Sequence, residues 1–110
     1  MAKANPFSPM CPSQDILALI GGKWSMLILC LLSGGARRTG ELARGAGGIS
    51  QKMLTQTLRE LERHGIVHRR DFGQVPPRVE YSLTPLGQSL SRLVREIEGW
   101  VESNYSRITR

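Results

Sequence analysis

The segment ISQKMLTQTLRELERHGIVHRRDFGQVPPRVEYSLT, residues 49 to 84, changes its hydrophobic period partway along. Its first half repeats apolar residues at about 3.6-residue spacing, which predicts an amphipathic helix. Ser50 is a suitable N-cap for this helix, and Gly65, directly after His64, is a suitable stop. We therefore expect a helix from Ser50 to His64. Its buried face should hold Met53, Leu54, Thr57, Leu58 and Leu61.

The second half of the segment alternates with a period of two, which is typical of strands. Val67 to Asp71 predicts a short polar strand, and Val79 to Leu83 predicts a half-buried one. The connection, Phe72 to Pro77, contains two prolines, which cannot donate to a sheet ladder. At the tip of a projecting hairpin Pro76 and Pro77 need no ladder partner, and they should stiffen the tip before it meets a ligand.

Three further helices are expected upstream. The first should be capped by Ser13 and stopped by Gly21-Gly22, and the second should run from Trp24 to Leu32 as a buried helix. A short third helix should run from about Thr39, its cap, to Arg44, before a turn at Gly45 to Gly48. The buried side of the first helix should consist of Ile16, Leu17, Leu19 and Ile20.

A long last helix should begin at Thr84-Pro85, with threonine as cap and proline as first helical residue, and should span about residues 85–108. Its apolar residues are too numerous for one small domain to bury. We expect Leu86 and Leu90 to serve the chain's own core. Residues toward Ile97, Trp100 and Val101 should face a second copy of the chain, unless all of them cover the protomer's own first helices.

Length and charge favour a single nucleic-acid-binding domain. The chain has 110 residues and a formal net charge of +6, and residues 37–80 hold nine basic and five acidic side chains, a local net of +4. Residues 1–12 form a proline-rich stretch that we expect to be a flexible arm, and residues 13–110 should form the folded domain. The longest apolar run, Met26 to Leu32, is too short for a membrane span, and no signal peptide is evident, so a cytoplasmic protein is expected.

The expected fold is mainly α with a small β-hairpin (α+β). A short helix, a turn and a longer helix with a polar outer face form a helix-turn-helix, and a hairpin after it is a wing. On the exposed face, Gln56 can pair with adenine, Arg59 with guanine, and Thr55 can touch a thymine methyl group or a phosphate. The remaining candidate DNA contacts are Thr39, Ser50, Gln51, Lys52, Pro77 and Arg78, of which Lys52 and the amides near Ser50 suit a phosphate. For an isolated helix, a merely solvated polar face would be the better interpretation.

Three motifs resemble the HxlR-type winged helix-turn-helix transcriptional regulators: GGKW at Gly21, GELARGAGGISQKMLTQTLRELERHGIV at Gly40, and VPPRVEYSLTPLG at Val75. The resemblance covers about Cys11 to Trp100. It implies N- and C-terminal dimerisation helices, a homodimer and an inverted-repeat operator, often near the regulator's own promoter, with repression as the favoured sense. It also implies that residues 47–52 start the recognition helix and that residues 75–78 form the wing. The family usually has an aromatic residue at Thr39 and Ile-Pro at 46–47, so this chain lacks apolar bulk there.

Cys11 is the candidate sensor of an oxidant or electrophile. The resemblance places a single family cysteine before the first helix, where Cys11 stands. Unpaired amides at a helix start stabilise a thiolate, which is the reactive form of cysteine. An intersubunit disulfide and a simple adduct both remain open, and an ordinary partly buried thiol is the alternative. Cys30, in the apolar helix, is expected to be buried and unreactive.

Other classes of function are weaker. His64 and His68 are four residues apart, but Gly65 lies between them and no third ligand is near, so we expect no metal and no cofactor. Neither a carboxylate pair nor a nucleophile–base pair is evident, so an enzyme is not expected. Two alternatives stay open: a regulator with a small-molecule pocket at the dimer interface, and a winged helix that binds only proteins.

Overall fold

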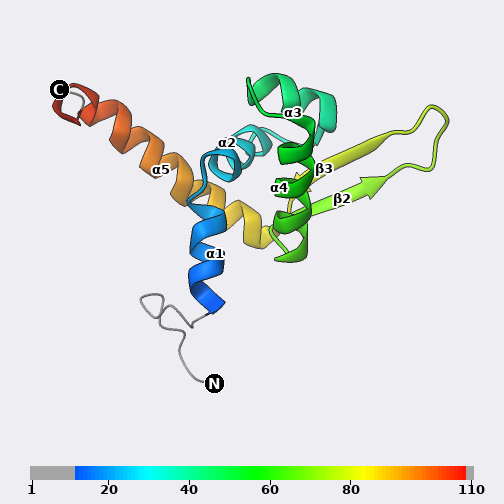
Figure 1. The fold of residues 1–110 in the computed structure, drawn as a ribbon, viewed down its shortest axis with the longest axis horizontal. Helices are drawn as coiled ribbons and strands as arrows, with labels where there is room; N and C mark the ends of the chain where they lie inside the picture. Colours follow the sequence, from blue (N-terminus) through cyan, green and yellow to red (C-terminus); the bar gives the residue numbers. More distant parts are fainter. Residues whose placement is uncertain (1–11, 109–110) are drawn as a thin grey trace.

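The computed structural model describes residues 12–108, which form five helices and a small sheet (Figure 1). The helix-turn-helix order is the predicted one, and the hairpin follows it directly. Cys11 and most of the expected arm lie outside the described residues. The elements are α1 (Pro12–Ile20), α2 (Lys23–Leu32), β1 (Arg37–Arg38), α3 (Thr39–Gly45), α4 (Gln51–Arg63), β2 (Val67–Asp71), β3 (Val79–Leu83) and α5 (Pro85–Ile108).

Helix α2 lies at the centre of the core. Ile28 and Leu29 are fully buried, and they pack in one cluster with the inner faces of α3, α4 and α5. Leu42 and Ala46 are also fully buried, so α3 docks firmly although the chain lacks the bulky residues that the family resemblance leads one to expect there. The buried cluster consists of Ile28, Leu29, Leu32, Leu42, Leu54, Leu58, Leu61, Ile66, Val67 and Val94.

The sheet has three strands, one more than the sequence predicts. The hairpin strands pair antiparallel from Val67–Leu83 to Asp71–Val79, as expected. The added strand, β1, pairs with β3 through Arg37 opposite Tyr81 and Arg38 opposite Glu80, which gives the order β1-β3-β2. A two-residue strand has no alternation to detect, and its partner lies more than forty residues away in the sequence.

Thr84 fixes the start of α5, as predicted. Its hydroxyl accepts a hydrogen bond from the Gly87 amide (3.0 Å) and donates toward the Gly65 carbonyl (2.6 Å). Its own amide donates to the Ile66 carbonyl (3.1 Å). Gly87 packs directly against that carbonyl, where a Cβ would collide with the Ile66 oxygen. This network anchors α5 to the end of α4.

Four residues that were expected in the core are exposed. Leu86 is 59% exposed, and on α1 Ile16 and Leu17 are also exposed, because α1 packs mainly against α2. Met53 is likewise exposed, since it lies at the edge of the buried face of α4. Helix α1 begins at Pro12, so Ser13 lies inside the helix and not at its N-cap.

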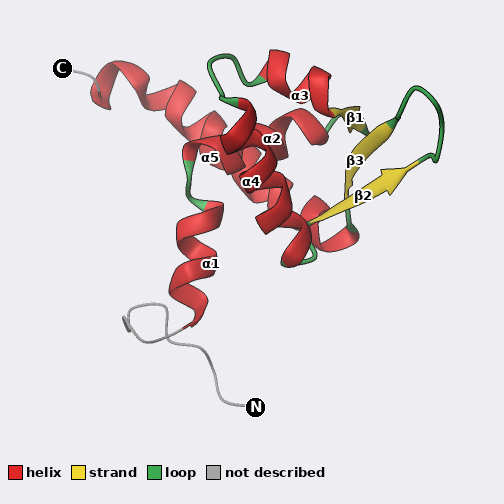
Figure 2. Cartoon of the chain, turned by 45° about the vertical axis from the view of Figure 1, so that its right-hand side comes forward, coloured by secondary structure: helices red, strands yellow, loops and turns green. Residues whose placement is uncertain are grey.

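Helices α1 and α5 extend away from the body on one side, and the hairpin projects on the other (Figures 1 and 2). Between them, α4 lies along the base of β2. Within residues 12–108 no single helix is long and apolar enough to cross a membrane, although the bent pair Gln14–Ile20 and Lys23–Leu32 passes the same length and composition test. The second member of that pair is the core helix α2.

Candidate nucleic-acid interface

The start of α4 is built as the sequence predicts. Gly48 has a φ of +92°, a conformation that favours glycine, and it turns the chain into the helix. The Ser50 hydroxyl accepts a hydrogen bond from the Met53 amide (3.0 Å), which confirms Ser50 as the N-cap. The other amides of the first turn have no partner within the helix, and such amides favour an anion.

The exposed face of α4 brings five predicted residues together. They line one shallow hollow, together with Glu60. Glu60 is held by Arg63 at 2.8 Å, whereas within residues 12–108 neither Lys52 nor Arg59 forms an ion pair. Both cations are therefore available to an external anion. The five residues are Gln51, Lys52, Thr55, Gln56 and Arg59, and the Gln51 amide donates to the Thr55 hydroxyl at 3.3 Å.

Thr39 does not cap α3, contrary to expectation. It is the first helical residue and is half-buried, while Arg38 occupies the N-cap position. The Arg38 amide donates to the Glu41 carboxylate at 2.9 Å, and this hydrogen bond lowers the pKa of Glu41. Arg38 is held in extended conformation by its pairing in β1, so it takes the N-cap position. Helix α3 therefore begins one residue earlier than the sequence pattern suggests.

In the wing, the side chain of Arg78 is engaged within the hairpin. Its guanidinium lies 2.6 Å from the Glu80 carboxylate and 4.6 Å from the centre of the Phe72 ring. Arg70 stacks on the same ring at 4.3 Å. Pro77 is exposed, and the tip prolines lie outside the ladder, as predicted; the peptide bond before Pro76 is cis.

The sequence pattern did not point to Arg70 or Phe72 as functional residues. The ring holds two guanidinium groups at the base of the tip, which concentrates positive charge there. The signal was present as the run HRRDF at residues 68–72, but its alternation indicated only a polar strand. The stacking of Arg70 and Arg78 on Phe72 depends on which residues face each other across the hairpin, and this register is not evident from the sequence.

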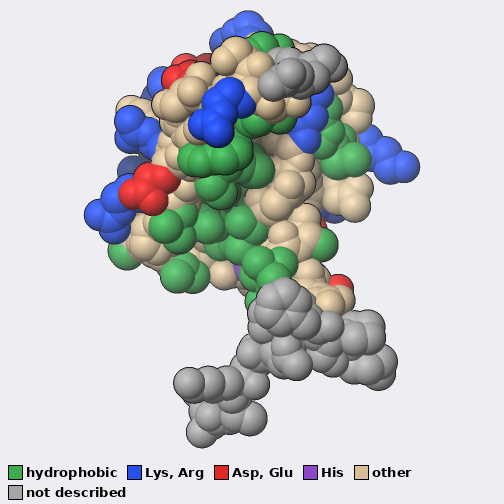
Figure 3. Space-filling model, turned by 90° about the vertical axis from the view of Figure 1, so that its left-hand side faces the viewer, with side chains coloured by type: hydrophobic (Ala, Val, Ile, Leu, Met, Phe, Trp, Pro, Cys, Tyr) green, Lys and Arg blue, Asp and Glu red, His purple; other side chains and the backbone are tan. Residues whose placement is uncertain are grey.

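An apolar surface lies away from the exposed face of α4 and from the wing. Among the predicted dimerisation residues, Ile97 is 52% exposed, Trp100 59% and Val101 40%. Viewed from the side of α5, apolar side chains gather in a band that runs down toward α1 (Figure 3). Ile16, Ile20, Leu86, Leu90 and Leu93 line a hollow of about 300 Å³ where α1 meets the start of α5.

The remaining candidates are inert. Cys30 is half-buried and not fully buried as expected, and its thiol donates to the Glu98 carboxylate (3.0 Å). Burial, followed by this hydrogen bond and the negative charge of Glu98, raises the pKa of Cys30 to about 12. His64 lies 2.8 Å from the Glu60 carbonyl, and residues 12–108 contain no cluster of three metal-ligating side chains.

Comparison with known proteins identifies relatives over nearly the whole chain. The family model described as HxlR-like helix-turn-helix matches residues 19–109. The HTH-type transcriptional regulator YtfH of Escherichia coli strain K12, itself uncharacterized, is 41% identical over 98% of this chain and 86% of its own length. A solved structure described as a transcriptional regulator, ytfH from Salmonella typhimurium, is 42% identical with a TM-score of 0.91, covering 96% of this chain and 95% of that one. The redox regulator HypR in its oxidized form is 47% identical with a TM-score of 0.78, over 86% and 97% of the two chains.

Proposed function

The chain belongs to the HxlR-like helix-turn-helix family of transcriptional regulators, and from this membership we propose that it binds an inverted-repeat DNA operator as a homodimer and represses transcription. The observation that carries the proposal is the exposed face of α4, where Lys52 and Arg59 lie beside Gln56 and form no ion pair with any other described residue. Amide and guanidinium groups at this spacing can read base edges in the major groove. Because chromosomal DNA is the proposed ligand, we infer action in the cytoplasm.

Different residues of the helix-turn-helix suit the phosphate backbone and the base edges. The capped start of α4, with Ser50 and Lys52, suits the phosphate backbone, and so does Thr39 at the start of α3. Gln51, Thr55, Gln56 and Arg59 follow along the same face and suit base edges. The wing would add Pro77 and Arg78 beside the duplex, with Arg70 as a further cation.

A homodimer is supported by the apolar band on α1 and α5. Its exposed members include Leu17, Leu93, Ile97, Trp100 and Val101, which is far more apolar surface than isolated surface residues supply. We propose that a second copy covers this band, with α5 crossing its equivalent. A two-fold dimer would set the two α4 helices about 34 Å apart, one turn of DNA, which accounts for an inverted repeat.

Thiol modification of Cys11 is the proposed switch. HypR, a redox regulator, shares the fold and 47% identity with this chain. Cys11 directly precedes α1, which belongs to the proposed dimer surface. Oxidation or alkylation there would tilt α1 against the partner and change the spacing of the two α4 helices, and a shift of a few ångströms is enough to spoil two simultaneous groove contacts.

The function is tested by selecting bound DNA from a random pool, with and without diamide. We expect recovery of an inverted repeat with half-sites about one turn apart, and its loss under diamide in wild type but not in Cys11→Ser. Recovery of no preferred sequence would contradict sequence-specific binding. Equal loss of binding under diamide in both proteins, or no loss in either, would remove Cys11 from the mechanism, but the proposal that the untreated protein binds DNA would stand.

A further inference from the structure

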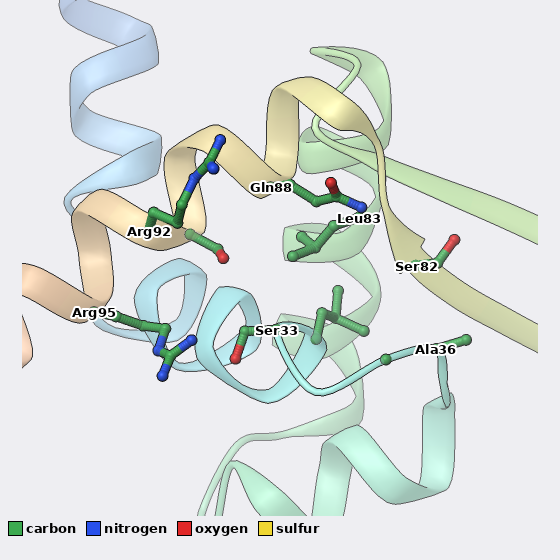
Figure 4. Close-up of a pocket in the computed structure, with 10 residues that line it drawn as sticks. Ser33, Ala36, Ser82, Leu83, Gln88, Arg92 and Arg95 are labelled. Carbon is green, nitrogen blue, oxygen red and sulfur yellow. The ribbon is translucent and has the colours of Figure 1, made fainter.

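A second cavity, of about 310 Å³, lies between the DNA-binding body and α5 (Figure 4). Its walls come from the end of α2, the segment before β1, the end of β3 and the first half of α5. It is separate from the α4 face and from the apolar hollow beside α1, because it shares no lining residue with either. Cavities of this size lie at the lower end of the range for small-molecule sites.

The cavity is rich in cationic and hydroxyl groups. Arg92 and Arg95 project from consecutive turns of α5 at one end, and Figure 4 shows Ser82 and Ala36 at the other end. Within residues 12–108 neither arginine forms an ion pair or a hydrogen bond. Glu98, one turn beyond Arg95, accepts its hydrogen bond from Cys30 instead.

Ser91 adds a hydroxyl group to the wall of the cavity. It is only 4% exposed, it lines the cavity, and its hydroxyl has no hydrogen-bond partner among the described residues. No described side-chain polar atom is sealed from solvent without a partner, so this hydroxyl opens into the cavity. It is therefore free to donate to or accept from a bound oxygen or a water molecule.

Part of the wall is apolar. Leu32 and Leu83 also line the cavity. An inorganic anion would leave these side chains uncovered, whereas a compact apolar body would cover them. Guanidinium groups bind carboxylate and phosphate oxygens with two parallel hydrogen bonds.

We propose that this cavity binds a small organic anion, a carboxylate or phosphate monoester with a compact apolar body. The anionic group lies between Arg92 and Arg95 and accepts from Ser91, and the apolar body lies against Leu32 and Leu83. Because α5 is the proposed dimer helix and the other walls belong to the DNA-binding body, occupancy changes the angle between them. This regulatory consequence rests on the proposed function; the binding itself does not.

Calorimetry with benzoate and phenyl phosphate, at constant ionic strength, tests the site, with neutral benzamide and inorganic phosphate as the matched probes. We expect saturable one-site binding of at least one organic anion and much weaker binding of benzamide and inorganic phosphate. Arg92→Gln/Arg95→Gln should weaken binding by at least about tenfold, since charge-assisted hydrogen bonds are lost. Arg63→Gln/Arg107→Gln removes the same charge elsewhere and should change binding less than about twofold.

Equal losses in the two double variants would mean diffuse counterion binding and would overturn the site, as would saturable binding of neither organic anion. DNA binding is measured separately, with and without the anion that binds. A change in DNA affinity of at least about threefold in wild type, absent from Arg92→Gln/Arg95→Gln, supports the coupling. Unchanged DNA affinity overturns the coupling alone, and failure of wild type to bind DNA without any anion overturns the proposed function but not the site.

Discussion

Arg78 and Glu80 form an ion pair on the wing, with a guanidinium nitrogen 2.6 Å from a carboxylate oxygen. The two residues are two positions apart, so they lie on the same side of the extended chain. To bind a phosphate, Arg78 would have to exchange Glu80 for the DNA. The ion pair therefore holds Arg78 in place, and it would reduce the affinity for DNA that Arg78 could contribute.

Glu80→Gln should strengthen DNA binding by roughly two- to fivefold, because release of a half-exposed ion pair is worth at most about 1 kcal/mol. Asp71→Asn is the matched control, since it removes the same charge from the same hairpin. In an Arg78→Ala background the gain from Glu80→Gln should shrink to that of Asp71→Asn. A gain that persists in full there would mean that Glu80 acts only by repelling the phosphates.

Arg59→Ala should cost about 1–3 kcal/mol of binding free energy and relax the preference at one base pair. Lys52→Ala should instead weaken all sequences alike and reduce the slope of log affinity against log salt by about one. Competition binding on a panel of single-base operator variants, repeated at three salt concentrations, distinguishes the two. The assignment of roles is reversed if Lys52→Ala changes the base preference and Arg59→Ala does not.

Trp100→Glu should dissociate the dimer, because it places a charge among the exposed apolar side chains of α5, which include Ile97 and Val101. Ser106→Glu is the control, since Ser106 lies on the opposite side of α5 by helical geometry. Light scattering should show a monomer for Trp100→Glu and a dimer for Ser106→Glu. A stable dimer of Trp100→Glu would move the interface elsewhere.

Cys30 should be alkylated slowly, and its reactivity should rise only at high pH. Its pKa is raised from 9.0 to about 12, so at pH 8 its thiolate fraction is roughly a thousandfold below that of a free thiol. At a pH between these two pKa values the Cys30 thiol is ionised in the unfolded chain and protonated in the folded chain. The free energy of unfolding should therefore fall as pH rises from about 9 to 12. Iodoacetamide rates in a Cys11→Ser background, with Glu98→Ala as comparison, measure this. If Cys30 in the folded protein were alkylated at pH 8 as fast as in the unfolded chain, its pKa could not be raised.

The helix boundaries that depend on local chemistry were predictable. Ser50 and Thr84 cap their helices through hydrogen bonds to residues three positions away, and Gly65 ends α4 with a φ of +73°. Such signals lie within a few residues of each other in the sequence, so they can be identified without knowledge of the tertiary structure.

Features that depend on distant partners were not predictable. Strand β1 exists because β3 offers a free edge, and its pairing made Arg38 the cap of α3 in place of Thr39. The exposure of Leu86 follows from the angle at which α5 leaves Thr84, which periodicity does not encode. The five polar residues of α4 were predictable as a group because one helix presents them all, whereas the stacking of Arg70 and Arg78 on Phe72 required the hairpin register.

Direct binding of the selected operator by Lys52→Ala/Gln56→Ala/Arg59→Ala, compared with wild type at one fixed salt concentration, tests the central claim. All three side chains line the same hollow on α4, so we expect a loss of affinity of at least roughly a hundredfold, about 3 kcal/mol. Arg92→Gln/Arg95→Gln, measured without any organic anion, serves as the control for charge lost elsewhere, and circular dichroism verifies that both variants stay folded. Operator binding by the folded triple variant with unchanged affinity would contradict the account, because α4 could then not be the helix that reads the DNA.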